Sequence, residues 1–188
     1  RSAEARPALL LRHIRRPQHF VSRGAPRPTM ASNTDSVAVL IPGEHIAKVI
    51  GKAGAGLKQI REATGCKVQV QQSPETNAVG GRRTDISGTA DQIAAAFQLI
   101  VNKAFSEATS TPMLLIPAEK AGQVVGKGGD NLKKVREECR VRCSVEREPV
   151  VDPTTGQQER MLTMSGEVAQ MARALRTLLG SPMTAYMG

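Results

Sequence analysis

Aromatic residues are almost absent from this sequence. Its 188 residues include three Phe, one Tyr and no Trp. Proteins built on RNA-recognition motifs or OB folds bind single strands by stacking bases on aromatic platforms. So few aromatic side chains cannot form such a platform, which excludes that mode of nucleic-acid recognition.

Metal and disulfide sites are not indicated either. The three cysteines form no Cys-x-x-Cys pair, their number is odd, and the three histidines share no spacing that would suit a metal ion. We therefore predict no disulfide framework, no metal site and no cofactor. Unpaired cysteines of this kind are typical of a reducing, intracellular compartment.

Hydrophobic runs are short, and the charge is positive. No apolar run approaches the roughly 18 residues that a membrane-spanning helix needs, so we predict no membrane partner. The formal charge of +9 favours polyanions such as nucleic acid. Residues 1–29 carry seven Arg and one acid, or 7 − 1 = +6, which leaves 9 − 6 = +3 for the rest. A nucleic-acid site beyond residue 29 must therefore come from a local arrangement of residues.

Residues 1–35 are predicted to be a disordered basic leader, because four prolines interrupt any long helix there. Arginine-rich, acid-poor leaders with a short apolar segment are also typical of mitochondrial transit peptides. Two interpretations stay open: a transit peptide, or residues that precede the protein's own start at Met30. The first would place the protein in the mitochondrion, and the second in the nucleus or the cytoplasm.

The rest of the chain contains one unit twice. The motif VIGKAG of residues 49–54 recurs as VVGKGG in residues 124–129, an offset of 126 − 51 = 75 between first glycines. At the same offset, without gaps, LKQIRE of residues 57–62 recurs as LKKVRE of residues 132–137. We therefore predict two domains, residues 36–108 and 109–180, followed by a disordered tail at residues 181–188.

Each unit is predicted to have the order βααββα, from apolar runs, residues three apart on helix faces and period-two alternation. The fold class is α+β, with a three-stranded antiparallel sheet and three helices on one face of it. In the first unit, strands are expected at residues 37–41 and 66–70, with a third strand that ends at residue 88. Helices are expected at residues 44–49, 55–64 and 90–104. In the second unit, strands are expected at residues 113–116 and 141–145, with a third strand that ends at residue 166. Helices are expected at residues 119–124, 130–139 and 167–179. Loops are expected at residues 73–81 and 148–158.

A Gly-Lys-x-Gly turn opens the second helix of each unit. Glycine has no Cβ, so a nucleic-acid backbone can approach the turn closely. The free N–H groups and positive dipole end of the following helix favour an anion such as phosphate. Lys52 and Lys127 add a mobile positive charge at the same point, although either could be an ordinary exposed lysine. We interpret the two turns as phosphate clamps.

This order and these motifs resemble the eukaryotic, type I KH-domain family over residues 36–180, and within it the poly(C)-binding and Nova group. The resemblance implies a protein that is not an enzyme and whose turns each clamp about four nucleotides of single strand. It implies single-stranded RNA as the partner, with single-stranded DNA as the alternative, and further protein partners in ribonucleoprotein complexes. No small-molecule substrate is expected. The implied role is post-transcriptional regulation of mRNA, through splicing, stability or translation.

The resemblance also implies which residues form each RNA-binding groove, with aliphatic members under the bases and basic members on the backbone and base edges. In the first unit they are Lys48, Ile50, Gly51, Lys52, Ala53, Gly54, Leu57, Lys58, Arg61, Val68, Val70 and Arg82. In the second they are Gln123, Val125, Gly126, Lys127, Gly128, Gly129, Leu132, Lys133, Arg136, Cys143, Val145 and Arg160. No catalytic residue is expected.

Several of these residues have plainer interpretations. Leu57 and Val68 could be core, and Arg61 and Arg136 could be solvated residues in helical ion pairs. If the arginines do contact bases, their match to the poly(C)-binding group predicts pyrimidine-rich RNA with cytosine at the central positions. Arginine presents a rigid fork of donors, and cytosine offers ring and carbonyl acceptors.

Two other functions compete with RNA binding. An enzyme could use the Gly-Lys turns as nucleotide loops, but a Walker loop needs Gly-x-x-x-x-Gly-Lys-Ser/Thr, which neither turn provides. A protein-interaction scaffold that had lost RNA binding would usually also lose the turn glycines or the lysine, and both units keep them. A direct RNA-binding assay separates the three functions.

The link between the units is short, about residues 106–111, so we expect them to pack together through their first strands and closing helices. In the resembling family such pairs can form an intramolecular pseudo-dimer. The second loop carries Glu148 and Asp152. Acids beside the groove would weaken phosphate attraction, so the second domain is expected to bind more weakly than the first.

Overall fold

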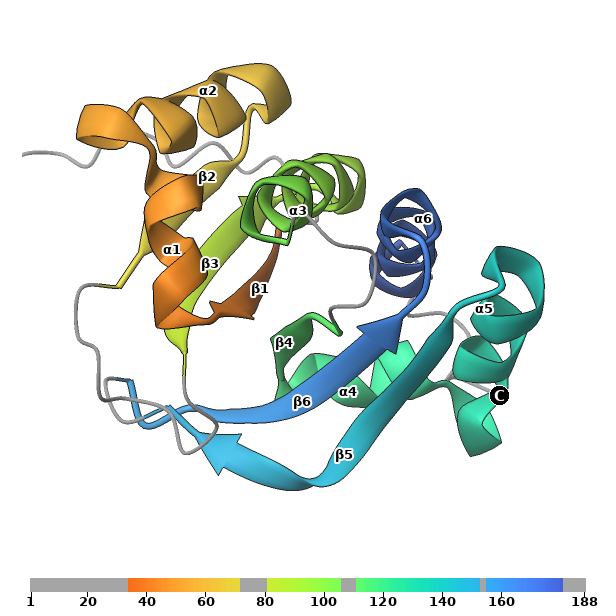
Figure 1. Ribbon diagram of the computed structural model, residues 1–188. Coiled ribbons are helices and arrows are strands. Elements are labelled where there is room, and N and C mark those ends of the chain that lie inside the picture. Colours follow the sequence, from red (N-terminus) through yellow and green to blue (C-terminus); the bar gives the residue numbers. More distant parts are fainter. Residues whose placement is uncertain (1–33, 72–80, 106–110, 153–154, 181–188) are drawn as a thin grey trace, which may run out of the picture. The chain divides into compact units, whose positions relative to one another are not determined.

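The computed structural model describes residues 34–71, 81–105, 111–152 and 155–180. The predictions for residues 1–33, for most of the first loop and for the tail at residues 181–188 lie outside this part of the chain. Within the described residues, the predicted order βααββα occurs twice and the α+β class is confirmed (Figure 1).

Each unit has three strands, three α-helices and a short 3-10 turn between its first two helices. The first unit contains β1 (Asp35–Ile41), α1 (Gly43–Ile50), η1 (Lys52–Gly54), α2 (Ala55–Thr64), β2 (Lys67–Val70), β3 (Arg82–Gly88) and α3 (Ala90–Ala104). The second contains β4 (Met113–Pro117), α4 (Ala118–Val125), η2 (Lys127–Gly129), α5 (Asp130–Cys139), β5 (Arg142–Val151), β6 (Gln158–Ser165) and α6 (Val168–Leu179).

Two sequence-based boundaries are wrong. Asp35, which we placed in the leader, is buried in β1 and forms an ion pair with Lys120 of α4. Residues 148–151, which we placed in a loop, continue β5. Proline is tolerated on edge strands and at bulges, and β5 is both an edge strand and irregular between Val145 and Pro149.

In the described part of the chain, the six strands form one antiparallel sheet in the order β2-β3-β1-β4-β6-β5. The two units meet where β1 pairs with β4, and the central pair joins Val39 to Leu114. These two residues are sequence equivalents, since 114 − 39 = 75, so the register is symmetric about them. The contact is a twofold, isologous one within a single chain, and it removes the free edges of both first strands. The predicted packing of the two units against each other is therefore present in the structure, in the form of an intramolecular pseudo-dimer.

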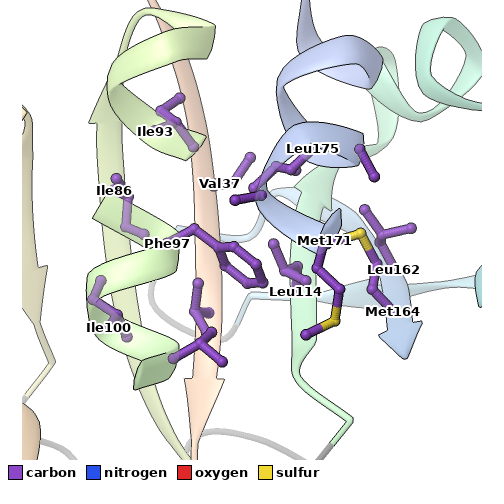
Figure 2. Close-up of a cluster of buried hydrophobic side chains, with 14 of the residues drawn as sticks. Val37, Ile86, Ile93, Phe97, Ile100, Leu114, Leu162, Met164, Met171 and Leu175 are labelled. Carbon is purple, nitrogen blue, oxygen red and sulfur yellow. The ribbon is translucent and has the colours of Figure 1, made fainter. Parts of the chain in front are cut away.

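The helices share one continuous core with the sheet, and α3 packs beside α6 across the boundary between the units. Phe97 of α3 is fully buried, and its ring points toward Leu114 and Met171 of the second unit (Figure 2). Burying a side chain of this size contributes about 1.5–3 kcal/mol relative to leaving it exposed. The two units are thus joined by apolar packing as well as by backbone hydrogen bonds.

A buried ion network between β3 and β6 of the same sheet also joins the units. Arg83 of β3 donates to both carboxylate oxygens of Glu159 on β6, at 2.5 and 2.7 Å, and to Asp85 Oδ1 at 2.7 Å. Its Nη1 lies 3.5 Å from Asp152 Oδ2 at the end of the β5–β6 hairpin. Burial opposes the charge on Arg83, but its hydrogen bonds to Glu159 and Asp85 prevail and raise its pKa.

None of the helices in the described residues combines the length and the hydrophobicity that a membrane-spanning segment needs.

Candidate nucleic-acid interface

The first turn, residues 51–54, has a backbone that favours glycine. Gly51 has φ 71° and ψ 177°, Ala53 has φ 51°, and Gly54 has φ 80°. A Cβ on Gly54 would meet nothing within 4 Å, so glycine is needed there for its left-handed backbone. Gly51 also has no room for a Cβ, which would lie 2.7 Å from the Gly56 nitrogen. The turn therefore presents bare backbone at the point where α2 begins.

Gly56 supports this turn, and the sequence analysis did not single it out. A Cβ at this buried position would lie 2.4 Å from the Val49 carbonyl oxygen and 2.9 Å from that of Ile50. α1 can approach α2 this closely only because the side chain is missing. The available signal was a glycine inside a predicted helix, which usually has a packing or functional reason.

The second turn, residues 126–129, repeats the backbone of the first with a different support. Gly126 has φ 78°, Gly128 φ 64° and Gly129 φ 87°. At the position equivalent to Gly56 stands Asn131, whose Nδ2 donates to the carbonyl oxygen of Gln123 at 2.7 Å. The asparagine side chain ties α4 to α5 by a hydrogen bond where the first unit uses close backbone packing.

The predicted basic residues of both clamps lie at the surface. Lys48, Lys52, Lys58, Lys127 and Lys133 are all exposed. Lys58 makes an ion pair of 3.8 Å with Glu62, and because both side chains are largely exposed, this contact holds the ammonium group only weakly. The lysines of the two turns are thus placed to meet a phosphate that approaches the start of α2 or α5.

Arg61 and Arg136 are anchored in the same way in both units. Arg61 Nε donates to the carbonyl oxygen of Val68 at 2.8 Å, and Arg136 Nε donates to that of Cys143 at 3.0 Å. In each case Nη2 donates to the same oxygen. Two of the five guanidinium N–H groups are used, so three remain for a ligand. The sequence analysis considered helical ion pairs for these arginines. The structure instead shows hydrogen bonds to the strand backbone, which fix the plane of each guanidinium.

The predicted aliphatic wall divides into two layers. Ile50, Leu57, Val70, Val125 and Val145 are partly exposed and pack on the core. Val68, Leu132 and Cys143 are buried, with 2%, 7% and 4% of their surface exposed. The partly exposed residues are the ones with surface to offer to a base, and the buried ones support them from below.

Arg82 and Arg160 take equivalent places on the last strand of each unit, with an offset of 160 − 82 = 78. Both are half-buried and lie on the helix-covered face of the sheet, four residues before the buried Ile86 in β3 and two before the buried Leu162 in β6. The Nε of Arg160 is buried and has no hydrogen-bond partner among the described residues. The structure does not link either arginine to its clamp.

The structure corrects the argument for a weaker second domain. Asp152, expected beside the second groove, is buried and lies against Arg83 of the first unit. Its charge is therefore matched by a cation and does not face incoming phosphate. Glu148 is exposed on β5, so of the two acids only Glu148 can act on a ligand.

Two hollows flank the anchored arginines. One, of about 500 Å³, is lined by Arg61, Lys67, Val68 and Asp85 among others. The other, of about 530 Å³, is lined by Arg136, Arg140, Arg142 and Cys143 among others. No group of three or more His, Cys, Asp or Glu side chains in the described residues could hold a metal ion. Cys66, Cys139 and Cys143 are buried free thiols, and burial raises the pKa of Cys66 and Cys143.

The repeated fold, the two glycine turns and the flanking arginines together define a class. A sequence model of the KH domain matches residues 36–102 and again residues 111–180. The chain belongs to the KH-domain family, and its two copies make it a tandem type I KH protein. KH domains clamp single-stranded nucleic acid at the GxxG turn. The family is one of binding domains, so the chain is a nucleic-acid-binding protein and not an enzyme.

Among curated proteins, the chain is similar to Far upstream element-binding protein 1 of Rattus norvegicus, with 29% identity over 136 residues. The match covers 64% of this chain and 21% of that protein, so it spans about a fifth of the relative's length. Among solved structures, it is similar to Dim2p from Pyrococcus horikoshii OT3, with 20% identity, 79% and 93% of the two chains covered, and a TM-score of 0.27. A chain of the a/eIF2alpha-aDim2p-rRNA complex from the same source matches at 19% identity, 81% and 90% coverage and a TM-score of 0.30. Scores this low carry no further conclusion.

Proposed function

We propose that the chain binds pyrimidine-rich single-stranded RNA, with cytosine favoured at the central positions, and acts in post-transcriptional regulation of mRNA. Its action would lie in the nucleus or the cytoplasm, within ribonucleoprotein complexes that bring further protein partners. The observation that carries the proposal is that both units contain the same arrangement of binding residues. Each unit combines a glycine turn carrying an exposed lysine with an arginine held on strand backbone.

Phosphate recognition follows from the turns. The bare backbone at Gly51 and Gly126 lets a phosphodiester approach the first N–H groups of α2 and α5. Lys52 and Lys127 supply the positive charge. These contacts fix the position of the strand without reading its bases.

Base selection would come from the anchored arginines. The bond to Val68 or Cys143 fixes each guanidinium, so its remaining N–H groups point in defined directions. A fixed fork of donors matches the adjacent ring nitrogen and carbonyl oxygen of cytosine, whereas uracil places a donor at that ring nitrogen. The partly exposed Ile50, Leu57 and Val70 would lie under the bases, as would Val125 and Val145.

Single-stranded DNA is the second candidate ligand. Phosphate clamping does not depend on the 2′-hydroxyl, which is the group by which proteins distinguish RNA from DNA. The name of the rat relative, an element-binding protein, also leaves the type of strand open.

Selection of bound sequences from random RNA and DNA pools tests the proposal. The full chain should enrich pyrimidine-rich RNA with cytosine at the centre, and enrichment of purine-rich RNA would contradict the base choice. Arg61→Lys and Arg136→Lys keep the charge and lose the fork, so they should bind with reduced preference for cytosine. A chain in which both turns carry Asp is the control and should enrich nothing. If the unchanged chain also enriches nothing, a protein-interaction scaffold replaces RNA binding.

A further inference from the structure

A basic hollow lies beside the anchored arginine of the second unit. It measures about 530 Å³, and its lining includes Arg136, Arg140, Arg142, Ser144, Thr163 and Ser165. No residue of this lining is a carboxylate. With Thr111, the lining holds three arginines and four hydroxyl groups around one open space, a surface of donors that suits an anion. We call this site the arginine hollow.

The hollow adjoins the predicted groove of the second unit. Arg136 belongs to both: it stands on α5, the helix that begins directly after the second turn, and its guanidinium is bound to the carbonyl oxygen of Cys143. Cys143 and Ser144, on the edge strand β5, also line the hollow. A strand that left the second clamp past Arg136 would therefore meet Arg140 and Arg142 next.

The equivalent hollow of the first unit keeps two cations, Arg61 and Lys67, and the two units differ at two equivalent positions. Gly65 stands where Arg140 stands, and Asp85 takes the place of Thr163, since 163 − 85 = 78. The Asp85 carboxylate accepts hydrogen bonds from Arg83 and Gln71, which keep it in place. A strand leaving the first clamp would thus meet a carboxylate that is already paired with Arg83 where the second unit offers a hydroxyl group, and it would lack the cation that Arg140 supplies.

Arg140 also occupies an unfavourable backbone position. It ends α5 with φ 54°, the left-handed conformation that Gly65 adopts at the end of α2 with φ 70°. A residue with a Cβ in that conformation is less stable than glycine by about 1 kcal/mol. The second unit thus holds a strained arginine where the first unit holds an unstrained glycine, and strain of this kind tends to gather at functional positions.

We propose that the arginine hollow binds one further phosphate of the nucleic-acid strand held in the second clamp. The inference rests on the proposed function, because it needs a strand in that clamp. It makes the second unit the one with the longer footprint and the steeper salt dependence. The first unit contributes its four-nucleotide clamp without this extension.

The test uses the full chain with Lys52→Asp and Ala53→Asp, so that the second clamp alone reports binding. Salt-dependent titrations would use RNA of about four nucleotides, and the same core extended to about eight on its 5′ or its 3′ side. Arg140→Gly relieves the left-handed strain, so the variant should fold at least as well as the unchanged chain. Arg142→Gln removes the second charge from an exposed strand position. Arg173→Gln, on the exposed face of α6, removes one charge elsewhere and is the control.

With one of the extended oligonucleotides, Arg140→Gly and Arg142→Gln should each weaken binding, and the slope of log affinity against log salt should become shallower by about 0.7. With the short oligonucleotide they should bind as tightly as the parent. An unchanged slope on every extended oligonucleotide would overturn the subsite. The subsite would also be overturned if the variants lost the same affinity on short and on extended RNA and Arg173→Gln lost as much. That result would show a general attraction between the positive protein and RNA and no specific contact. If the parent chain binds none of the oligonucleotides, the proposed function itself fails.

Discussion

Replacing Arg83 by Met should strongly destabilise the pair of KH domains. The Arg83 side chain is 11% exposed, and it bridges Asp85 of its own strand to Glu159 and Asp152 of the second domain. The side chains of Glu159 and Asp152 are only 6% and 3% exposed. Met fills a similar volume without the charge, so the carboxylates would stay buried and lose their cation.

The magnitude follows from the burial of these partners. Removing one partner of a buried ion pair costs about 3–5 kcal/mol, because an uncompensated charge is left inside the protein. For a domain pair of this size, 1 kcal/mol corresponds to about 2–4 °C in Tm, so the melting temperature should fall by roughly 6–20 °C. Salt should not restore the loss, since buried pairs are screened far less than exposed ones.

Thermal and urea unfolding, followed by circular dichroism, would measure the effect. Arg176→Met is the matched control, because the Arg176–Asp91 pair also joins the two domains but its side chains are 63% and 67% exposed. That change should alter the free energy of unfolding by no more than about 0.5 kcal/mol.

A double variant separates the effect of losing the ion pair from the effect of leaving a buried carboxylate without its cation. Arg83→Met with Glu159→Met removes the cation and its main partner together, while Asp85 keeps its bond from Gln71 and Asp152 keeps one from Thr155. It should recover most of the stability that Arg83→Met loses. If Arg83→Met is as stable as Arg176→Met, the network does not stabilise the domain pair and the reasoning is wrong.

Two further predictions concern the interior. Gly56→Ala would place a Cβ 2.4 Å from the Val49 carbonyl oxygen, so it should destabilise the first domain by about 1–3 kcal/mol and weaken its RNA binding, as urea unfolding and titration would show. Burial raises the pKa of the Cys66 and Cys143 thiols above 9.0, so the stability they contribute is complete below about pH 9. It should fall as the pH rises through their folded-state pKa, as urea unfolding at a series of alkaline pH values would show.

Local patterns in the sequence were enough to predict most of the elements. The helices at Ala55–Thr64, Asp130–Cys139 and Ala90–Ala104 have the expected bounds. Their ends are marked by residues whose chemistry is local, such as the capping box between Thr89 and Gln92. Gly65, at the end of α2, is a second such marker.

Contacts between distant residues were not predictable in this way. The sequence analysis names Arg82 but not its neighbour Arg83, whose main partner, Glu159, lies 76 residues further along the chain. Asp152 was assigned to the second groove for the same reason. The bonds of Arg61 and Arg136 to strand carbonyls also depend on how a helix meets an edge strand, which the helical pattern alone does not reveal.

The central claim is that the two glycine turns hold the strand. Titration of RNA into three folded variants tests it: Lys52→Asp with Ala53→Asp, Lys127→Asp with Gly128→Asp, and all four changes together. Ala53 and Gly128 have left-handed φ values of 51° and 64°, which Asp tolerates better than most residues, so circular dichroism should show intact folds.

Each paired variant should lose one of two binding sites, and the four-fold variant should bind no RNA. Since Asp152 is paired with Arg83, the change in the second turn should harm binding no less than the change in the first. Each lost phosphate contact should make the salt slope shallower by about 0.7. A four-fold variant that is folded and binds RNA as tightly as the unchanged chain would contradict the account.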